Sequence, residues 1–308
     1  MESLNYFKKS CLKYSFALLA LCASPHLFSA DEVISIKDAT NDQNDKKAKI
    51  KDLDALLQER LTMEDTTNPF QILLHKPNYI MLYNNNYTHK NNYGLADSTL
   101  KSRKGEIKFQ ISFKKSIFDA KNYFDKDYFD IFVGYTQLSF WQAYVKSAYF
   151  RESDYSPEIF LTSNVYKNLM VSTGLNHESN GRGGLYERSW NRVYMDFSIS
   201  KYNYYLSVTP WILVFKSAST KLHNPDIRKY MGNEAIVLGY KDHLNMSVKL
   251  RNIERADKYL TVEALISYPI KEHINLTINA FNGYGQNLIE YNKRSTTLGI
   301  GFSLNNYL

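Results

Sequence analysis

The chain has 308 residues, of which 44% are hydrophobic, and its 38 Lys and Arg residues against 31 Asp and Glu give a net charge of +7. This charge is modest and the basic residues are scattered, so we interpret it as a solvated or headgroup-facing surface and expect no nucleic-acid partner. No apolar run approaches the roughly 20 residues that a membrane-spanning helix needs, which excludes a helical membrane protein.

Residues 1–30 have the pattern of a secretory signal peptide that is removed on export. Three lysines precede an apolar stretch over residues 14–24, and the Ser-Ala pair at 29–30 provides a cleavage end. Both cysteines, Cys11 and Cys22, fall in this segment, so we expect an exported chain without disulfides. Closed backbone hydrogen bonding in a β-barrel is one way to stabilise such a chain.

Residues 31–76 form a polar, charged lead-in, for which a periplasmic location is expected. Within it, residues 47–61 carry Ile50, Leu53 and Leu57 at helical spacing. A short helix and a loose arm both remain open for this stretch.

Residues 77–308 repeat with the period of two that indicates β-strands. The clearest case is the stretch 106–114, where apolar residues alternate with Glu, Lys, Gln and Ser. Charged groups on the second face suit a water-filled or hydrogen-bonded lumen. At about 19 to 20 residues per strand and turn, the region holds about 12 strands, so we predict an all-β, 12-stranded antiparallel transmembrane barrel of the outer-membrane type. Polar clusters that we interpret as turns lie at 84–86, 125–127, 181–184 and 241–243.

Three polar residues extend the apolar faces of two neighbouring strands. In residues 169–179, His177 and Ser179 fall on the same face as four largely apolar residues, and Asn191 shares its face with Val193 and Met195. The apolar face of a membrane barrel is its outside. A base, a hydroxyl and an amide on a lipid-facing wall indicate a serine hydrolase whose substrate is a lipid.

The expected chemistry assigns each of these residues a role. His177 takes the proton of Ser179, Ser179 attacks an ester, and Asn191 holds the imidazole without placing a charge beside hydrocarbon. The glycine-rich turn after Ser179 offers backbone N–H groups for an oxyanion, although a plain turn is the alternative. A single histidine on a strand is more often structural, and only the combination favours catalysis.

Two motifs carry a resemblance to a known family. They are Asn-His-Glu-Ser-Asn-Gly-Arg at 176–182 and Arg-Ser-Trp-Asn-Arg at 188–192, with further matches at 150–155, 224–232 and 283–292. At these residues the chain resembles the outer-membrane phospholipase A family of Gram-negative bacteria. The resemblance implies a 12-stranded outer-membrane barrel that hydrolyses the sn-1 and sn-2 acyl esters of phospholipids and lysophospholipids, depends on Ca²⁺ and is activated by homodimerisation.

The resemblance also implies roles for single residues. His177, Ser179 and Asn191 take the triad positions, and the Gly181 amide takes the oxyanion position. The implied Ca²⁺ ligands are the Arg182 carbonyl and residue 187 of one subunit with Ser147 of the other, and Gln137 is implied to pair across the dimer interface. Residue 187 is Glu here, where a compared member of the family has Ser, and a carboxylate is expected to raise calcium affinity.

Two alternatives come from other classes of protein. A passive porin or surface adhesin would also have charged lumen strands, but it does not need the outward polar trio, and it would cause liposome leakage without ester cleavage. A soluble β-sandwich esterase would purify without detergent, which the signal peptide and the alternating terminal strand argue against.

Overall fold

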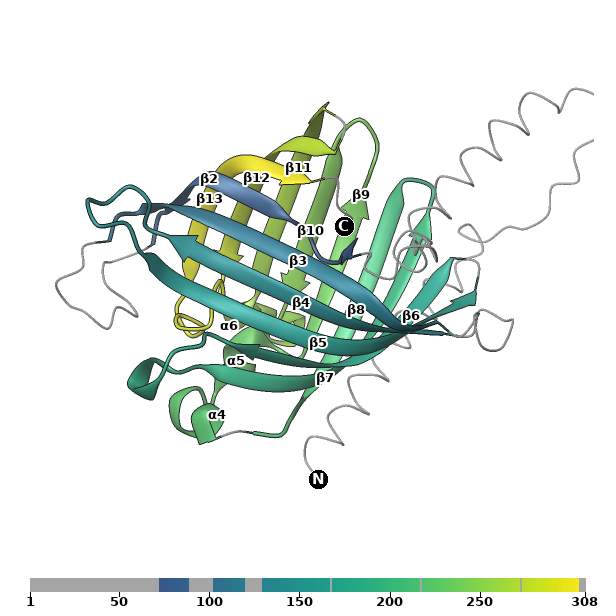
Figure 1. Ribbon diagram of the computed structural model, residues 1–308, viewed down its shortest axis with the longest axis horizontal. Helices are drawn as coiled ribbons and strands as arrows, with labels where there is room; N and C mark the ends of the chain where they lie inside the picture. The colour runs from purple at the N-terminus through teal and green to yellow at the C-terminus, as the bar shows by residue number, and fades with distance from the viewer. Residues whose placement is uncertain are drawn as a thin grey trace, which may run out of the picture.

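The fold is a closed antiparallel β-barrel in a computed structural model that describes residues 72–88, 102–119, 129–166, 168–216, 218–271 and 273–304 (Figure 1). The predicted signal peptide, the possible helix at 47–61 and the turn at 125–127 lie outside the described residues. In the described part, no helix combines the length and the apolar character needed to cross a membrane.

The strands follow one another around the barrel in chain order. They are β1 (Leu73–Leu74), β2 (Tyr79–Asn86), β3 (Gly105–Asp119), β4 (Asp130–Trp141), β5 (Phe150–Tyr166), β6 (Leu169–Ser179), β7 (Ser189–Lys201), β8 (Tyr204–Val214), β9 (Glu234–Tyr240), β10 (Asn245–Arg251), β11 (Thr261–Lys271), β12 (Ile274–Gly283) and β13 (Ser295–Leu304). The last strand, β13, pairs with β2, which closes the ring. The two-residue β1 pairs with the part of β3 beyond the reach of β2. The ring therefore has the 12 antiparallel strands that the sequence predicts, β2 to β13.

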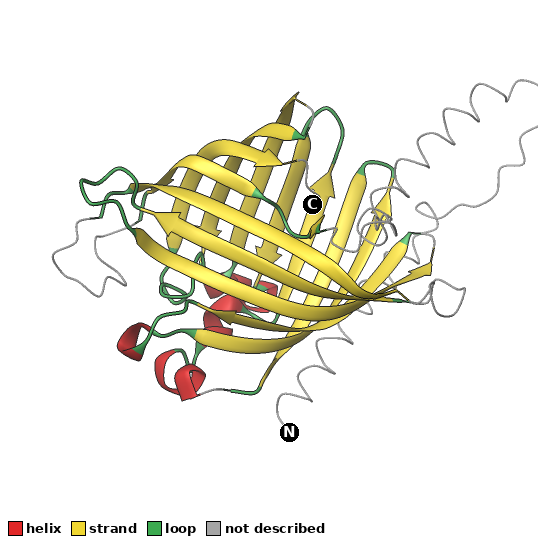
Figure 2. Ribbon diagram, in the orientation of Figure 1, coloured by secondary structure: helices red, strands yellow, loops and turns green. Residues whose placement is uncertain are grey.

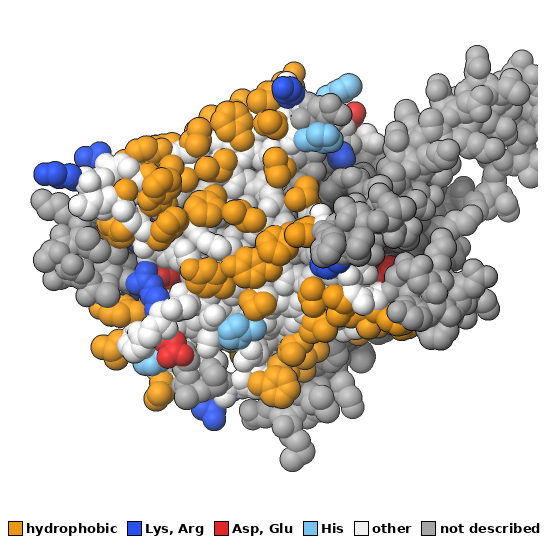
Figure 3. All heavy atoms as spheres, in the orientation of Figure 1, with side chains coloured by type: hydrophobic (Ala, Val, Ile, Leu, Met, Phe, Trp, Pro, Cys, Tyr) orange, Lys and Arg blue, Asp and Glu red, His pale blue; other side chains and the backbone are white. Residues whose placement is uncertain are grey.

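The strand alternation separates an apolar outside from a polar inside. On β3, Ile111 and Phe113 are exposed, whereas Glu106, Lys108 and Ser112 are buried in the interior. Figure 3 shows the apolar side chains spread over the outer wall of the barrel. This arrangement suits lipid outside and hydrogen-bonded groups inside, and it excludes the soluble sandwich.

One predicted turn is wrong. The cluster at 84–86 continues β2, and Asn84 and Asn86 are buried on the inner face. Asparagine favours turns because its side chain competes with the backbone for hydrogen bonds. In a barrel with a polar interior the same side chain also fits the inward positions of a strand.

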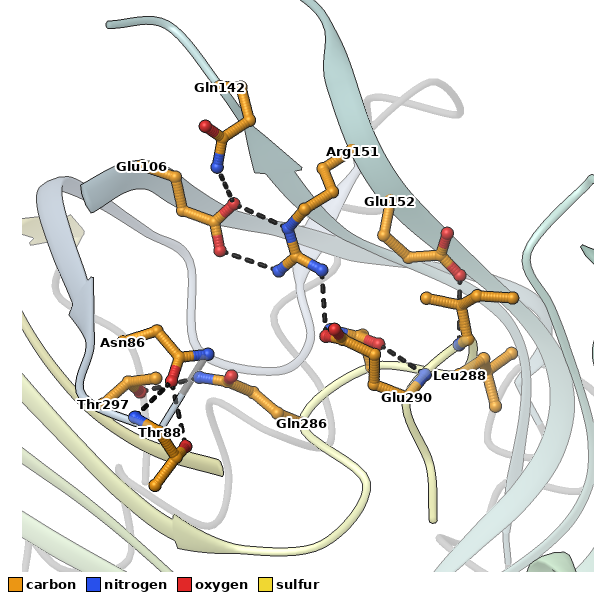
Figure 4. A network of polar contacts seen from close by, with 12 residues as sticks. Asn86, Thr88, Glu106, Gln142, Arg151, Glu152, Gln286, Leu288, Glu290 and Thr297 are labelled. Carbon is orange, nitrogen blue, oxygen red and sulfur yellow. Dashed lines mark hydrogen bonds and ion pairs between the residues drawn. The ribbon is translucent and has the colours of Figure 1, made fainter. Parts of the chain in front are cut away.

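Ion pairs in the interior join residues that are far apart in the chain. Arg151 of β5 donates to both oxygens of Glu106 at 2.9 and 2.7 Å and to Glu290 at 2.9 Å (Figure 4). Lys108 donates to Glu263 at 3.0 Å. An internal cavity of about 370 Å³ is lined by Lys108 and Glu263, among others. Such paired charges satisfy one another where few other partners exist.

The segment before β2 also lies against the interior. The ring of His75 stacks on Phe160 at 5.0 Å, and its Nε2 lies 3.0 Å from Glu158, which also pairs with Lys76. Burial lowers the pKa of His75 to about 4, and the cations Lys76 and Lys114 act in the same sense while Glu158 opposes them. His75 is therefore neutral at pH 7.

The helical segments of the described residues lie at one end of the barrel (Figure 2). They are η1 (Gly184–Tyr186), α4 (Ala218–His223), α5 (Ile227–Met231), η2 (Ile253–Arg255) and α6 (Ala256–Tyr259). A core that includes Trp190, Trp211, Ile227 and Leu288 packs at this end. The helices and the core therefore lie at the end of the barrel that carries the β6–β7 connection.

Candidate active site on the outer wall

The hairpin of β6 and β7 carries the three predicted site residues. The antiparallel register sets His177 opposite Asn191 and Ser179 opposite Ser189. The intervening residues Asn176 and Glu178 line the interior, so His177 and Ser179 lie on the outer wall. The prediction that the hairpin brings Asn191 beside His177 agrees with this register.

His177 and Asn191 form a directed pair. Nδ1 of His177 lies 2.8 Å from Oδ1 of Asn191, while Nδ2 of Asn191 donates to the carbonyl of Phe215 at 2.9 Å. The second bond fixes the amide, so that its oxygen faces the imidazole. An amide oxygen only accepts, so Nδ1 carries the proton and Nε2 is left as the basic nitrogen.

Ser179 lies two residues further along the same strand and face. Backbone positions two apart on a strand are about 6.6 to 6.8 Å apart. Its neighbour on β5 is Tyr155, also on the outer wall. Among the described residues, no hydrogen bond joins Ser179 to His177. Catalytic hydrogen bonds are often long without substrate and tighten when it binds.

The connection 180–188 turns directly after Ser179. Gly181 has φ +64°, and a Cβ there would meet the Tyr155 ring at 3.0 Å, so the position favours glycine. Gly181 is exposed and lies two residues after the predicted nucleophile Ser179. This placement is compatible with an oxyanion donor, which stays a prediction.

Asn180 organises this connection, a function that the sequence reasoning missed. Its buried side chain accepts from the Arg188 amide at 3.0 Å and donates to the Tyr186 carbonyl at 2.9 Å. It also donates to Glu152 at 3.0 Å, which ties the loop to the interior of β5. The signal available in the sequence was an Asn directly before a glycine turn.

The predicted Ca²⁺ ligands lie in two neighbouring connections. The guanidinium of Arg182 points inward to Glu152, with Nε 2.9 Å from Oε2, which anchors the backbone that carries its carbonyl. Arg188 donates to the carbonyls of Leu185 and Glu187 at 2.9 and 2.8 Å. Glu187 is half-buried and is the acidic residue of this connection, so it provides the carboxylate oxygens.

Ser147 is exposed in the connection between β4 and β5. In the described part of the chain, no cluster of three His, Cys, Asp or Glu residues could hold a metal. A carbonyl, a carboxylate and a hydroxyl are nevertheless the hard oxygen donors that Ca²⁺ takes, so the donor chemistry fits. Gln137 lies on the outer wall of β4, where it accepts from Tyr135 at 3.1 Å and donates to Ser139 at 3.0 Å.

The inner face of the hairpin is tied more densely than the outer face. Trp190 is fully buried and donates from Nε1 to Glu178 at 2.9 Å, and Arg192 donates to the same carboxylate at 2.7 Å. The guanidinium of Arg192 lies 4.1 Å from the Trp190 ring centroid. These contacts join β6 to β7 directly behind the catalytic candidates.

Comparisons with known proteins agree with the sequence motifs. A family model described as phospholipase A1 matches residues 57–304. A relative from Neisseria meningitidis is 36% identical over 252 residues, which cover 75% of this chain and 64% of the relative. The chain therefore spans slightly less than two thirds of that relative.

Two solved structures share the fold. The outer membrane phospholipase A from Escherichia coli is 31% identical with a TM-score of 0.72, covering 82% of this chain and 98% of that one. The Salmonella typhi outer membrane phospholipase dimer with bound calcium is 31% identical with a TM-score of 0.69, covering 78% and 94%.

Proposed function

The chain belongs to the phospholipase A1 family, and from this premise we propose that it hydrolyses the sn-1 and sn-2 acyl esters of phospholipids and lysophospholipids with Ser179, His177 and Asn191, depends on Ca²⁺ and is activated as a homodimer. The family resemblance, the outer-membrane barrel and the hydrolase class are confirmed. The triad, the metal and the dimer are our proposal.

The pair formed by His177 and Asn191 carries this proposal. An imidazole on a lipid-facing wall, oriented by an amide that is itself anchored to a carbonyl, has a free basic nitrogen beside a serine of the same face. A porin wall has no need for this arrangement, because polar groups facing lipid are costly unless they have partners or a function.

The proposed reaction has two halves. Nε2 of His177 accepts the proton of Ser179 while Oγ attacks the acyl carbonyl, and the Gly181 amide donates to the resulting oxyanion. The imidazolium then protonates the leaving alcohol, which yields an acyl-serine and a lysophospholipid. In the second half, His177 deprotonates a water that attacks the acyl-serine, and the proton returns to Ser179 as the fatty acid leaves.

The calcium proposal rests on the donor set. The Arg182 carbonyl and the Glu187 carboxylate of one subunit would hold the ion together with Ser147 of the partner subunit. When bound, the ion supplies positive charge that supports the oxyanion. The Salmonella typhi relative is described as a dimer with bound calcium, which supports the same assembly here.

Fatty-acid release from phospholipid micelles tests the function. Refolded wild type and Ser179→Ala are compared with Ca²⁺ and with a chelator, and Ser247→Ala on β10 serves as a matched serine control. We expect release only from wild type and Ser247→Ala, and only with Ca²⁺. Equal release by Ser179→Ala would remove the nucleophile from the proposal.

The oligomeric state is measured in the same samples. We expect Ca²⁺ and substrate to shift the protein from monomer to dimer in chemical crosslinking. Full activity from a barrel that stays monomeric would contradict activation by dimerisation. Leakage of liposomes without ester cleavage would favour the porin alternative.

A further inference from the structure

Phe215 has an unusual backbone conformation directly beside the candidate site. It follows the last residue of β8, Val214, which pairs with Asn191 across the wall. Its φ is +45°, in the left-handed region that favours glycine. A bulky side chain in this region is strained, and strained residues concentrate at functional sites.

The carbonyl of this strained residue accepts a hydrogen bond from the candidate site. The carbonyl of Phe215 accepts the hydrogen bond from Nδ2 of Asn191 at 2.9 Å, and Oδ1 of the same amide faces His177 at 2.8 Å. The conformation of Phe215 therefore determines where the amide is held, and the amide determines the orientation of the imidazole.

The ring of Phe215 is a second, separate feature. It is 76% exposed, although a glycine would adopt this backbone at less cost. Leu185, in η1 of the connection that follows Ser179, is 78% exposed. Two largely exposed apolar side chains therefore lie on segments next to the candidate triad, one on the residue that holds Asn191 and one in the connection that follows Ser179. An exposed apolar ring is stabilised when an apolar ligand such as an acyl chain covers it.

We propose that Phe215 is both a positioning residue, which holds Asn191 through its left-handed carbonyl, and a specificity-determining residue, whose ring contacts the acyl chain of the substrate. This inference rests on the proposed lipid hydrolysis. The proposal predicts a preference for phospholipids with long acyl chains, because only a chain that extends past the reacting ester reaches the ring of Phe215.

A simpler account makes the ring an ordinary member of the apolar wall. That account predicts that removing the ring weakens binding to every micellar surface equally, whatever the length of the acyl chains. The ratio of activities on long and short chains therefore separates the two accounts.

Two substitutions separate the backbone function from the ring. Phe215→Gly removes the ring and keeps the left-handed conformation. Phe215→Pro also removes the ring but fixes φ near −65°, so the carbonyl leaves its position. Leu222→Ala removes another apolar side chain, 74% exposed in α4, as a matched control.

The experiment measures kcat and KM with phosphatidylcholine carrying either eight-carbon or sixteen-carbon chains, both presented in mixed micelles of the same detergent, so that the micellar surface is the same for the two substrates. For Phe215→Gly we expect kcat within about twofold of wild type on the short substrate and a loss of about tenfold in kcat/KM on the long one, mainly in KM. For Phe215→Pro we expect kcat to fall about tenfold further on both substrates, with a shifted pH profile of kcat/KM. Leu222→Ala should match wild type.

Each outcome decides part of the proposal. An unchanged long-to-short ratio in Phe215→Gly overturns the function of the ring. Equal kcat in Phe215→Gly and Phe215→Pro overturns the positioning function, and thermal melting in detergent checks that the proline variant is folded. Absence of Ser179-dependent hydrolysis by wild type would instead be a failure of the proposed function, which Ser179→Ala in the same assay reveals.

Discussion

The two faces of the β6–β7 hairpin differ in how densely their side chains are hydrogen-bonded. On the inner face, Glu178 accepts from both Trp190 and Arg192, and Asn176 accepts from Arg192. On the outer face, one bond joins His177 to Asn191 and one more joins Asn191 to Phe215. Because adjacent residues point to opposite faces, the inner contacts fix the backbone that aims the outer side chains.

This difference teaches how a polar site is kept on a lipid-facing wall. Partners for polar groups are scarce outside, so extra hydrogen-bonding groups there would be costly. The rigidity comes instead from the interior, where charges and amides have partners. Removing outer residues should therefore abolish chemistry, and removing inner residues should lower stability.

The largest expected effect is on the outer face. His177→Ala should lower kcat by at least about 10³-fold, because the proposed general base is lost, and should leave thermal unfolding in detergent unchanged. Asn176→Ala, on the neighbouring inner position, should instead lower mainly the stability. We expect kcat within about tenfold of wild type and a free energy of unfolding that is lower by about 1–2 kcal/mol. Similar kcat losses in the two variants would break the contrast between the faces.

The next effect is on the inner ion pairs. Arg151→Met leaves the buried carboxylates Glu106 and Glu290 without their shared cation. We expect a loss of about 3–5 kcal/mol in the free energy of unfolding, measured by urea titration in detergent. Replacing both acids by glutamine in the same variant should restore much of the loss. If Arg151→Met were as stable as wild type, the interior ion pairs would not be what makes the barrel wall rigid.

A smaller, pH-dependent effect is expected at His75. Its folded pKa of about 4 lies below the unfolded value of 6.5, so the unfolded chain takes up a proton first as the pH falls. The stability contributed by neutral His75 is present above pH 6.5 and is lost progressively toward pH 4, by about 2 kcal/mol at pH 5. His75→Gln should flatten the pH dependence of urea unfolding between pH 7 and 5. A slope equal to that of wild type would contradict this.

The smallest effect concerns Glu187 in the outer connection. Glu187→Gln removes the carboxylate charge but keeps an oxygen, so the Ca²⁺ concentration for half-maximal activity should rise about tenfold with kcat at saturation unchanged. A calcium titration of fatty-acid release measures this. An unchanged titration would exclude Glu187 as a ligand.

The fold and part of the site could be predicted from the sequence because both follow from alternation. Charged and apolar residues alternate through 106–114, which predicts a barrel strand, and the same period places His177 and Ser179 on one face. An antiparallel hairpin around 180–188 then brings Asn191 beside His177.

The remaining features depend on contacts that no local pattern carries. Asn180 organises the loop through Glu152, which lies 28 positions away in the chain. Phe215 lies beyond the end of a strand, where the alternation stops and the backbone turns left-handed. The stacking of His75 on Phe160 joins the start of the described chain to the wall, and only the closed barrel brings the two together.

The closure between β2 and β13 has a consequence for the order in which the molecule assembles. The β6–β7 hairpin is a local element, and its strands can pair as soon as residues 169–201 are present. The ring, in contrast, is sealed by the first and the last of its 12 strands. Until β2 and β13 pair, each leaves an unpaired edge that other chains can bind, so the barrel is most exposed to aggregation at these two edges and not at the candidate active site.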